Sequence, residues 1–189
     1  MVKRNYITLA RKSALIQISE LRKIKKVFNS SFTKAVELIL NCKGKVIFAG
    51  IGKSGLIARK ISATFSSVGI PSFFCDPAQA LHGDMGQIEK RDILIIFSYS
   101  GNTSELTNML KYANRYRIKI IGVASKSDSI LLKASDVKLL LPKVREADLT
   151  GMVPTTSTSI TLLLGDCLAT TVMQKRNFSK EKFKVFHPG

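Results

Sequence analysis

The chain has 189 residues, 45% of them hydrophobic, and its 30 Lys and Arg residues against 13 Asp and Glu give a formal net charge of +17. This length predicts a single domain that buries roughly 70% of the surface exposed by the unfolded chain. No apolar run approaches the roughly 18 residues of a membrane span, so the sequence predicts no membrane-spanning helix.

The predicted elements begin with helices and continue as an alternation of strands and helices. Apolar residues recur on one helical face in residues 5–28 and again in residues 31–42. The predicted strands are 45–49, 71–75, 93–97, 119–123 and 137–141, and the later helices are 55–67, 103–116, 129–134 and 157–174. This order predicts an α/β fold in which a doubly wound, five-stranded parallel sheet is flanked by helices and preceded by an N-terminal helical hairpin.

The first loop of interest is Gly50-Ile-Gly-Lys-Ser-Gly55, between a strand and a helix. A Walker A loop is excluded because its first glycine would fall on Ile47. A dinucleotide fingerprint fits formally, with Asp76 after the next strand, although Lys53 and Ser54 are unusual beside a pyrophosphate. A sugar-phosphate turn, in which Lys53 supplies a cation and Ser54 a hydroxyl, is the third interpretation, and a plain tight turn the fourth.

The second loop, Ser98-Tyr-Ser-Gly-Asn-Thr-Ser-Glu105, follows a continuous apolar strand and precedes a helix. It combines free backbone N–H groups, hydroxyl donors and the positive end of a helix dipole, which predicts a phosphate site with Glu105 close by. A dinucleotide protein has no need for this second loop, whereas a sugar monophosphate needs one phosphate cradle beside catalytic groups. In parallel sheets both loops fall at the carboxyl ends of the strands, where ligands bind.

The third loop, Pro154-Thr-Thr-Ser-Thr-Ser159, again places hydroxyls before a helix. These residues either cap the helix or contact the substrate. Elsewhere, the basic residues are spread along the chain, and the densest cluster, Arg22–Lys26, lies on the polar side of a predicted helix without a nucleic-acid-binding signature. We therefore expect no nucleic-acid or membrane partner, and a positive surface that favours an anionic small substrate.

The three cysteines, Cys42, Cys75 and Cys167, are scattered and form no metal-type pair. The first residues lack the apolar segment of a secretory signal. We therefore expect reduced thiols and a cytoplasmic location.

The pattern Ser98-x-Ser-Gly-x-Thr-x-Glu105 resembles the signature of the sugar isomerase (SIS) domain. A wider set of motifs resembles the arabinose 5-phosphate isomerase family from about Gly44 to the last residue. These motifs are Gly50–Gly55, Ser72-Phe-Phe-x-x-Pro77, His82-Gly-Asp84, Arg145-Glu146, Pro154-Thr-Thr-Ser157 and His187-Pro-Gly189. The resemblance implies a flavodoxin-like SIS domain over residues 44–189, with the helices of residues 1–43 packed on it. The chain departs from many relatives in ending before the C-terminal CBS pair that they carry, so we expect either a natural short form or a fragment.

By this resemblance, the family's four catalytically important positions fall on Lys53, Glu105, Glu146 and His187. Asp76 replaces a histidine that is a possible metal ligand in relatives, and we expect that no cofactor is required and that a bound divalent metal such as zinc is not catalytic. Together with the loops above, the resemblance predicts these substrate-binding residues: Gly52, Ser54, Gly69, Ile70, His82, Ser98, Ser100, Gly101, Thr103, Pro142, Lys143, Val144, Thr155 and Ser157.

The implied activity interconverts D-arabinose 5-phosphate and D-ribulose 5-phosphate through an enediol, for synthesis of Kdo and lipopolysaccharide, in a homo-oligomer (dimer or tetramer). We expect Glu146 to be the base, Lys53 to stabilise the enediolate, and His187 to assist ring opening or hydroxyl proton transfer. Glu105 would orient these groups or act as a second acid or base. The alternatives are a non-catalytic sugar-phosphate-binding SIS regulator and a nucleotide-dependent oxidoreductase.

Overall fold

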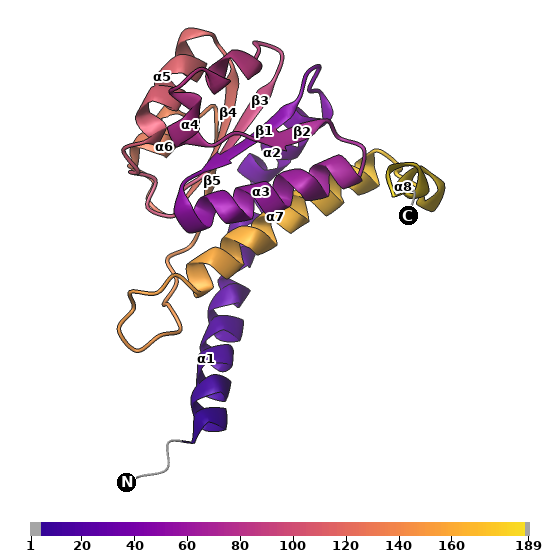
Figure 1. Cartoon of the computed structure of the whole chain (residues 1–189). Coiled ribbons are helices and arrows are strands. Elements are labelled where there is room, and N and C mark those ends of the chain that lie inside the picture. Colours follow the sequence, from indigo (N-terminus) through magenta and orange to yellow (C-terminus); the bar gives the residue numbers. More distant parts are fainter. Residues whose placement is uncertain (1–4, 188–189) are drawn as a thin grey trace.

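The computed structural model describes residues 5–187. Within this range five parallel strands form one sheet in the order β2-β1-β3-β4-β5, with helices on both faces (Figure 1). The strands are β1 (Val46–Gly50), β2 (Ser72–Phe74), β3 (Ile93–Phe97), β4 (Lys119–Ala124) and β5 (Val137–Leu140). The predicted doubly wound, five-stranded parallel sheet is confirmed. None of the helices in residues 5–187 combines the length and apolar character needed to cross a membrane.

The helices that follow the strands lie close to their predicted positions. Two short helices and a 3₁₀ turn appear in segments that the sequence pattern leaves unassigned: α4, α8 and η2. The bounds are α1 (Tyr6–Leu21), η1 (Arg22–Val27), α2 (Ser30–Leu40), α3 (Gly52–Ser67), α4 (Pro77–Ala80), η2 (Asp84–Gln87), α5 (Leu106–Arg115), α6 (Ile130–Ala134), α7 (Thr156–Lys175) and α8 (Lys180–Phe186).

The sheet separates two apolar layers because successive strand residues point to opposite faces. Val46 and Phe48 pack into the layer formed with α2, α3 and α7. Ile47 and Ala49, their neighbours on β1, pack into the layer formed with α4, α5 and α6. Strands β1 and β3 are buried along their whole length, which explains their continuous apolar sequence.

The N-terminal region differs from the prediction in two respects. The helix predicted over residues 5–28 ends at Leu21 and continues as η1, whose buried Ile24 and Val27 are three residues apart, the repeat of a 3₁₀-helix. The two N-terminal helices also diverge: α2 packs on β5 and α7, whereas α1 contacts α7 and extends away from the body of the protein (Figure 1). All of α1 remains at least partly exposed in the described chain.

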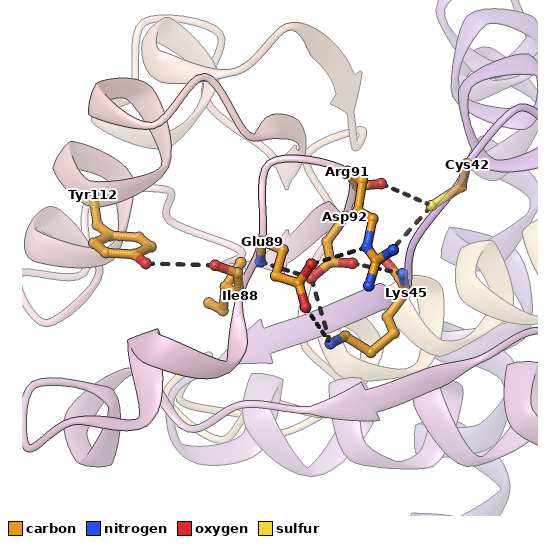
Figure 2. A network of polar contacts seen from close by, with 7 residues as sticks. All are labelled: Cys42, Lys45, Ile88, Glu89, Arg91, Asp92 and Tyr112. Atoms are coloured by element: carbon orange, nitrogen blue, oxygen red, sulfur yellow. Dashed lines mark hydrogen bonds and ion pairs between the residues drawn. The ribbon is translucent and has the colours of Figure 1, made fainter.

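The amino ends of β1 and β3 are joined through the buried carboxylate of Asp92 (Figure 2). Its Oδ1 accepts a hydrogen bond of 2.7 Å from the backbone N–H of Lys45, and its Oδ2 one of 2.8 Å from that of Glu89. The Lys45 ammonium lies 3.8 Å from Oδ2. This network holds together the amino ends of the strands, opposite the glycine- and hydroxyl-rich loops at their carboxyl ends.

Candidate active site

A cleft of about 390 Å³ opens at the carboxyl edge of the sheet. It lies where β1 and β3 are neighbours but their following helices pack on opposite faces, α3 on one and α5 on the other. Such a switch point is the usual ligand site of an open α/β sheet. The lining residues are Ile51, Lys53, Ser54, Ile57, Ser98, Tyr99, Ser100, Thr103, Glu146, Pro154, Ser157, Thr158 and Thr161.

The turn from β1 into α3 supplies one wall of the cleft. A Cβ on Gly55 would lie 2.6 Å from the carbonyl oxygen of Gly50, so this tight turn requires glycine there. The apolar side chain of Ile51, at the N-cap, cannot accept hydrogen bonds from the first N–H groups of α3. Those groups, together with the exposed Lys53 and the hydroxyl of Ser54, favour an anion.

The turn that leaves β3 is folded around its own hydroxyls. Ser98 Oγ lies 2.8 Å from Thr103 Oγ1 and accepts a hydrogen bond from the backbone N–H of Gly101 at 3.1 Å. Gly101 has φ +69°, and a Cβ there would lie 2.3 Å from Ser129 Oγ. Only glycine therefore suits this point. The result is a preformed loop that brings Ser98, Ser100 and Thr103 to the cleft.

Glu146 caps α7 from a loop outside the helix. Its Oε2 accepts hydrogen bonds from Thr155 N at 2.8 Å, Thr155 Oγ1 at 3.0 Å and Ser157 N at 3.2 Å. Burial raises the pKa of Glu146, but the hydrogen bonds from Ser157 and Thr155 outweigh it, and the net pKa is lowered. Thr155 Oγ1 also accepts a hydrogen bond from Ala147 N, so Thr155, predicted to bind substrate, is already engaged in holding this loop.

The loop that carries Glu146 is held by two residues that the sequence analysis did not select. Tyr99 Oη accepts a hydrogen bond from Val144 N at 2.9 Å and donates one to Pro142 O at 3.2 Å. Burial raises the pKa of Tyr99, which keeps it protonated as a donor. The second residue, Glu20, accepts a hydrogen bond from Arg145 N at 3.0 Å. The predicted substrate segment Pro142–Val144 thus packs behind the cleft lining, where Tyr99 orients it.

Glu105, His82 and Asp76 lie outside the lining of the cleft. Glu105 is exposed, and its own backbone N–H and the hydroxyl of Ser104 lower its pKa. His82 is exposed in the turn after α4, a short helix that contacts α5. Asp76 accepts a hydrogen bond from Ala78 N and caps α4. Residues 5–187 bring no three His, Cys, Asp or Glu side chains together as metal ligands, so the surroundings of Asp76 do not fit a metal centre.

A second group of predicted site residues lies near the C-terminal ends of α3 and α7. Helices α3 and α7 pack along each other, and both begin at the cleft (Figure 1). Gly69 and the buried Ile70 follow the C-terminal end of α3, roughly 24 Å from its start at 1.5 Å per residue. Gly69 lines a separate cavity of about 310 Å³ with Phe178 and Phe186.

His187 belongs to this distant group, because it ends α8, which follows α7. Its ring stacks on Phe183 with the centroids 3.7 Å apart, and its Nδ1 lies 2.9 Å from the carbonyl oxygen of Phe183. Within one chain, His187 is therefore remote from Lys53 and Glu146. The last two residues of its motif, Pro188 and Gly189, lie outside the described residues.

Comparison with known proteins identifies relatives that match most of the chain. A family model described as the SIS domain matches residues 39–171. A probable arabinose 5-phosphate isomerase of Haemophilus influenzae is 39% identical over 185 residues, which are 98% of this chain and 55% of the relative. The arabinose 5-phosphate isomerase KdsD of Shigella flexneri is 41% identical over 169 residues, 89% of this chain and 52% of the relative. The chain thus spans about half the length of the curated relatives it matches.

Among solved structures, an Escherichia coli protein in complex with arabinose 5-phosphate is similar over the full length of both chains. The sequence identity is 32%, the TM-score is 0.94, and the match covers 100% of each chain.

Proposed function

The chain belongs to the SIS domain family, and we propose that it is an aldose–ketose isomerase that interconverts D-arabinose 5-phosphate and D-ribulose 5-phosphate. The observation that carries this proposal is the composition of the cleft, where the cation of Lys53, a loop of hydroxyls and the carboxylate of Glu146 line one volume. The names of the relatives and the ligand of the similar solved structure support the choice of substrate.

The phosphate is assigned to the two anion-favouring turns. The first N–H groups of α3, the hydroxyl of Ser54 and the hydroxyls of Ser98, Ser100 and Thr103 are the donors. Binding the phosphate at this end of the substrate orients the reacting carbons and lets remote binding energy act on the transition state. The strongly positive chain also favours the approach of an anionic sugar phosphate.

The isomerisation moves a proton between C1 and C2 of the open-chain sugar. Glu146 removes the proton from the carbon next to the carbonyl group, the electron pair forms an enediolate, and the proton returns to the neighbouring carbon. All three hydrogen bonds that hold Glu146 are accepted by Oε2, so we assign the proton transfer to the other oxygen, Oε1. Lys53 stabilises the charge that develops on the carbonyl oxygen.

His187 and Glu105 do not line the cleft of their own chain, so the cleft of one chain does not explain the roles proposed for them. We infer that His187 reaches the cleft of a second copy, where it assists ring opening or hydroxyl proton transfer, so that the active form is a homo-oligomer. Glu105 is exposed at the same sheet edge as the cleft and is assigned an orienting or second acid–base role. We further propose that the reaction takes place in the cytoplasm and supplies Kdo for lipopolysaccharide.

The competing function is a SIS regulator that binds a sugar phosphate without converting it. The carboxylate of Glu146 in the cleft favours the enzyme, because a site that only binds a phosphate gains nothing from a negative charge beside it. An assay of ketose formation from arabinose 5-phosphate, without added metal or nucleotide, separates the two functions.

The variant Glu146→Gln tests the base. We expect its kcat to fall by at least about 100-fold, the usual contribution of general base catalysis, with substrate binding retained. The amide oxygen of glutamine can still accept hydrogen bonds from α7, which keeps the loop in place. Glu37→Gln, at an exposed position of α2, is the matched control and should behave as wild type. Full turnover by Glu146→Gln would remove Glu146 from the mechanism.

A further inference from the structure

We propose that Glu20, on α1, is a positioning residue that holds Glu146 in place through the backbone N–H of Arg145. This inference rests on the proposed function, because it assumes that Glu146 acts on the substrate. It assigns a role to a helix that otherwise extends away from the protein (Figure 1).

The C-terminal half of α1 touches both segments that determine where Glu146 lies. Gln17 Oε1 accepts a hydrogen bond of 3.2 Å from Ser159 Oγ, in the first turn of α7. Glu20 Oε2 accepts a hydrogen bond of 3.0 Å from Arg145 N, beside Glu146 in the chain. Helix α1 therefore contacts the loop that carries Glu146 and the helix that Glu146 caps.

The side chain of Glu20 is suited to this task because it is largely shielded and charged. It is 14% exposed, and Lys23 Nζ donates to the same oxygen that accepts from Arg145 N. Hydrogen bonds to an ionised acceptor are roughly twice as strong as neutral ones. Lys23 also lies 3.5 Å from Lys143 O, so the pair contacts the loop on both sides of Val144.

The loop is held from α1 on one side and from α7 on the other, and Glu146 lies between these contacts. Loss of the Glu20 contact frees Arg145 to move, and the adjoining Glu146 then shifts relative to Lys53 and the hydroxyl loops. Misplacement of a reacting group by about 1 Å can lower a rate about 100-fold. Substrate affinity should change little, because the donors assigned to the phosphate lie on the turns after β1 and β3.

The test compares Glu20→Ala with Glu20→Gln. We expect kcat to fall about tenfold or more in Glu20→Ala, with KM within about twofold of wild type. Glu20→Gln should recover most of the activity, since its amide oxygen can still accept from Arg145 N. Glu37→Ala on α2 is the control for removing an exposed glutamate from a helix. Alanine favours the helix, so α1 itself should persist.

A second readout does not depend on turnover. Amide hydrogen exchange at Arg145 should be faster in Glu20→Ala than in wild type, and should return toward the wild-type rate in Glu20→Gln. Unchanged exchange at Arg145, or unchanged kcat in an active enzyme, would overturn the role of Glu20. So would equal impairment of the alanine and glutamine variants, or a rise in KM alone. If the wild-type protein forms no ketose, the proposed function fails, whereas the exchange measurement still decides whether Glu20 holds Arg145.

Discussion

At the scale of single residues, Glu146 caps α7 and is also the residue to which we assign the role of base. A helix N-terminus stabilises a nearby negative charge, and the first turn of α7 supplies N–H groups to this carboxylate. The same bonds orient the group toward the cleft and keep it ionised. Capping of α7 and base catalysis are therefore compatible, because the cap occupies Oε2.

The hydroxyl of Thr155 contributes to the lowered pKa of the Glu146 carboxylate, beside the hydrogen bonds from Ser157 and from the backbone of Thr155. Thr155→Val removes one donor to Glu146 and should raise its pKa, because the ionised form loses a hydrogen bond. The acid limb of the kcat/KM profile should therefore move to higher pH. Thr155→Ser, which keeps the hydroxyl, should behave like wild type, as should Thr170→Val at an exposed position farther along α7. An unshifted acid limb in Thr155→Val would contradict this assignment.

Thr155→Val should also lower the free energy of unfolding, by an amount that depends on pH. A carboxylate whose pKa is lowered in the folded state stabilises the protein above its unfolded pKa, and the stabilisation is lost as the pH falls through the folded pKa. Thr155→Val reduces this contribution, so the destabilisation should be present at neutral pH and should shrink at acid pH.

At the scale of elements, the carboxyl and amino ends of the strands differ in what they carry. The carboxyl edge bears the cleft, whereas the amino edge bears the Asp92 network (Figure 2). Asp92 joins the segments before β1 and β3, the two strands beside the cleft. The strand alignment beneath the site is thus secured at the opposite edge.

We expect Asp92→Ala to lower the free energy of unfolding by about 2–4 kcal/mol, since it leaves two backbone donors without their buried acceptor. The measurement is urea denaturation. Glu89→Ala removes a half-exposed carboxylate from the same network and should cost less than about 1 kcal/mol. The kcat of folded Asp92→Ala should match wild type. A stability loss as small as that of the control would show that Asp92 does not secure the strands.

At the scale of the whole molecule, one chain carries two separated groups of predicted site residues. Lys53 and Glu146 lie where α3 and α7 begin, and Gly69 and His187 lie beyond where these helices end. Packed parallel helices hold such groups apart within one chain, so the proposed joint action of Glu146 and His187 needs a second copy. Helix α1 is also exposed, with Ile7 and Leu15 at 64% and 65% exposure.

Mixing inactive variants tests whether copies share a site. Co-expressed Glu146→Gln and His187→Ala chains should regain ketose formation, because some sites then combine an intact Glu146 with an intact His187 from another copy. Glu146→Gln mixed with Lys53→Ala should remain inactive, since both residues line the cleft of one chain. Failure of the first mixture would argue that His187 acts within its own chain or not at all.

Local sequence patterns were sufficient to predict the sheet and the positions of the anion-favouring turns. Apolar runs mark β1 and β3 because buried parallel strands are apolar on both faces, and glycines with hydroxyls mark the turns after them. The positions of Lys53, Ser54 and Ser98 in one cleft follow from parallel strand order, which brings the carboxyl ends of neighbouring strands together.

Contacts between residues far apart in the chain depend on tertiary packing and could not be predicted from local patterns. Glu20 and Arg145 are 125 residues apart, and no local pattern marks their contact. The engagement of Thr155 with Glu146, and the distance of His187 from the cleft, depend equally on how the loop and α8 pack. The sequence alone therefore determined the fold class and the anion-favouring turns, because both arise between residues close in the chain. Packing determined how Glu146 is held and which predicted site residues one chain brings to the cleft, because these arrangements involve residues far apart in the sequence.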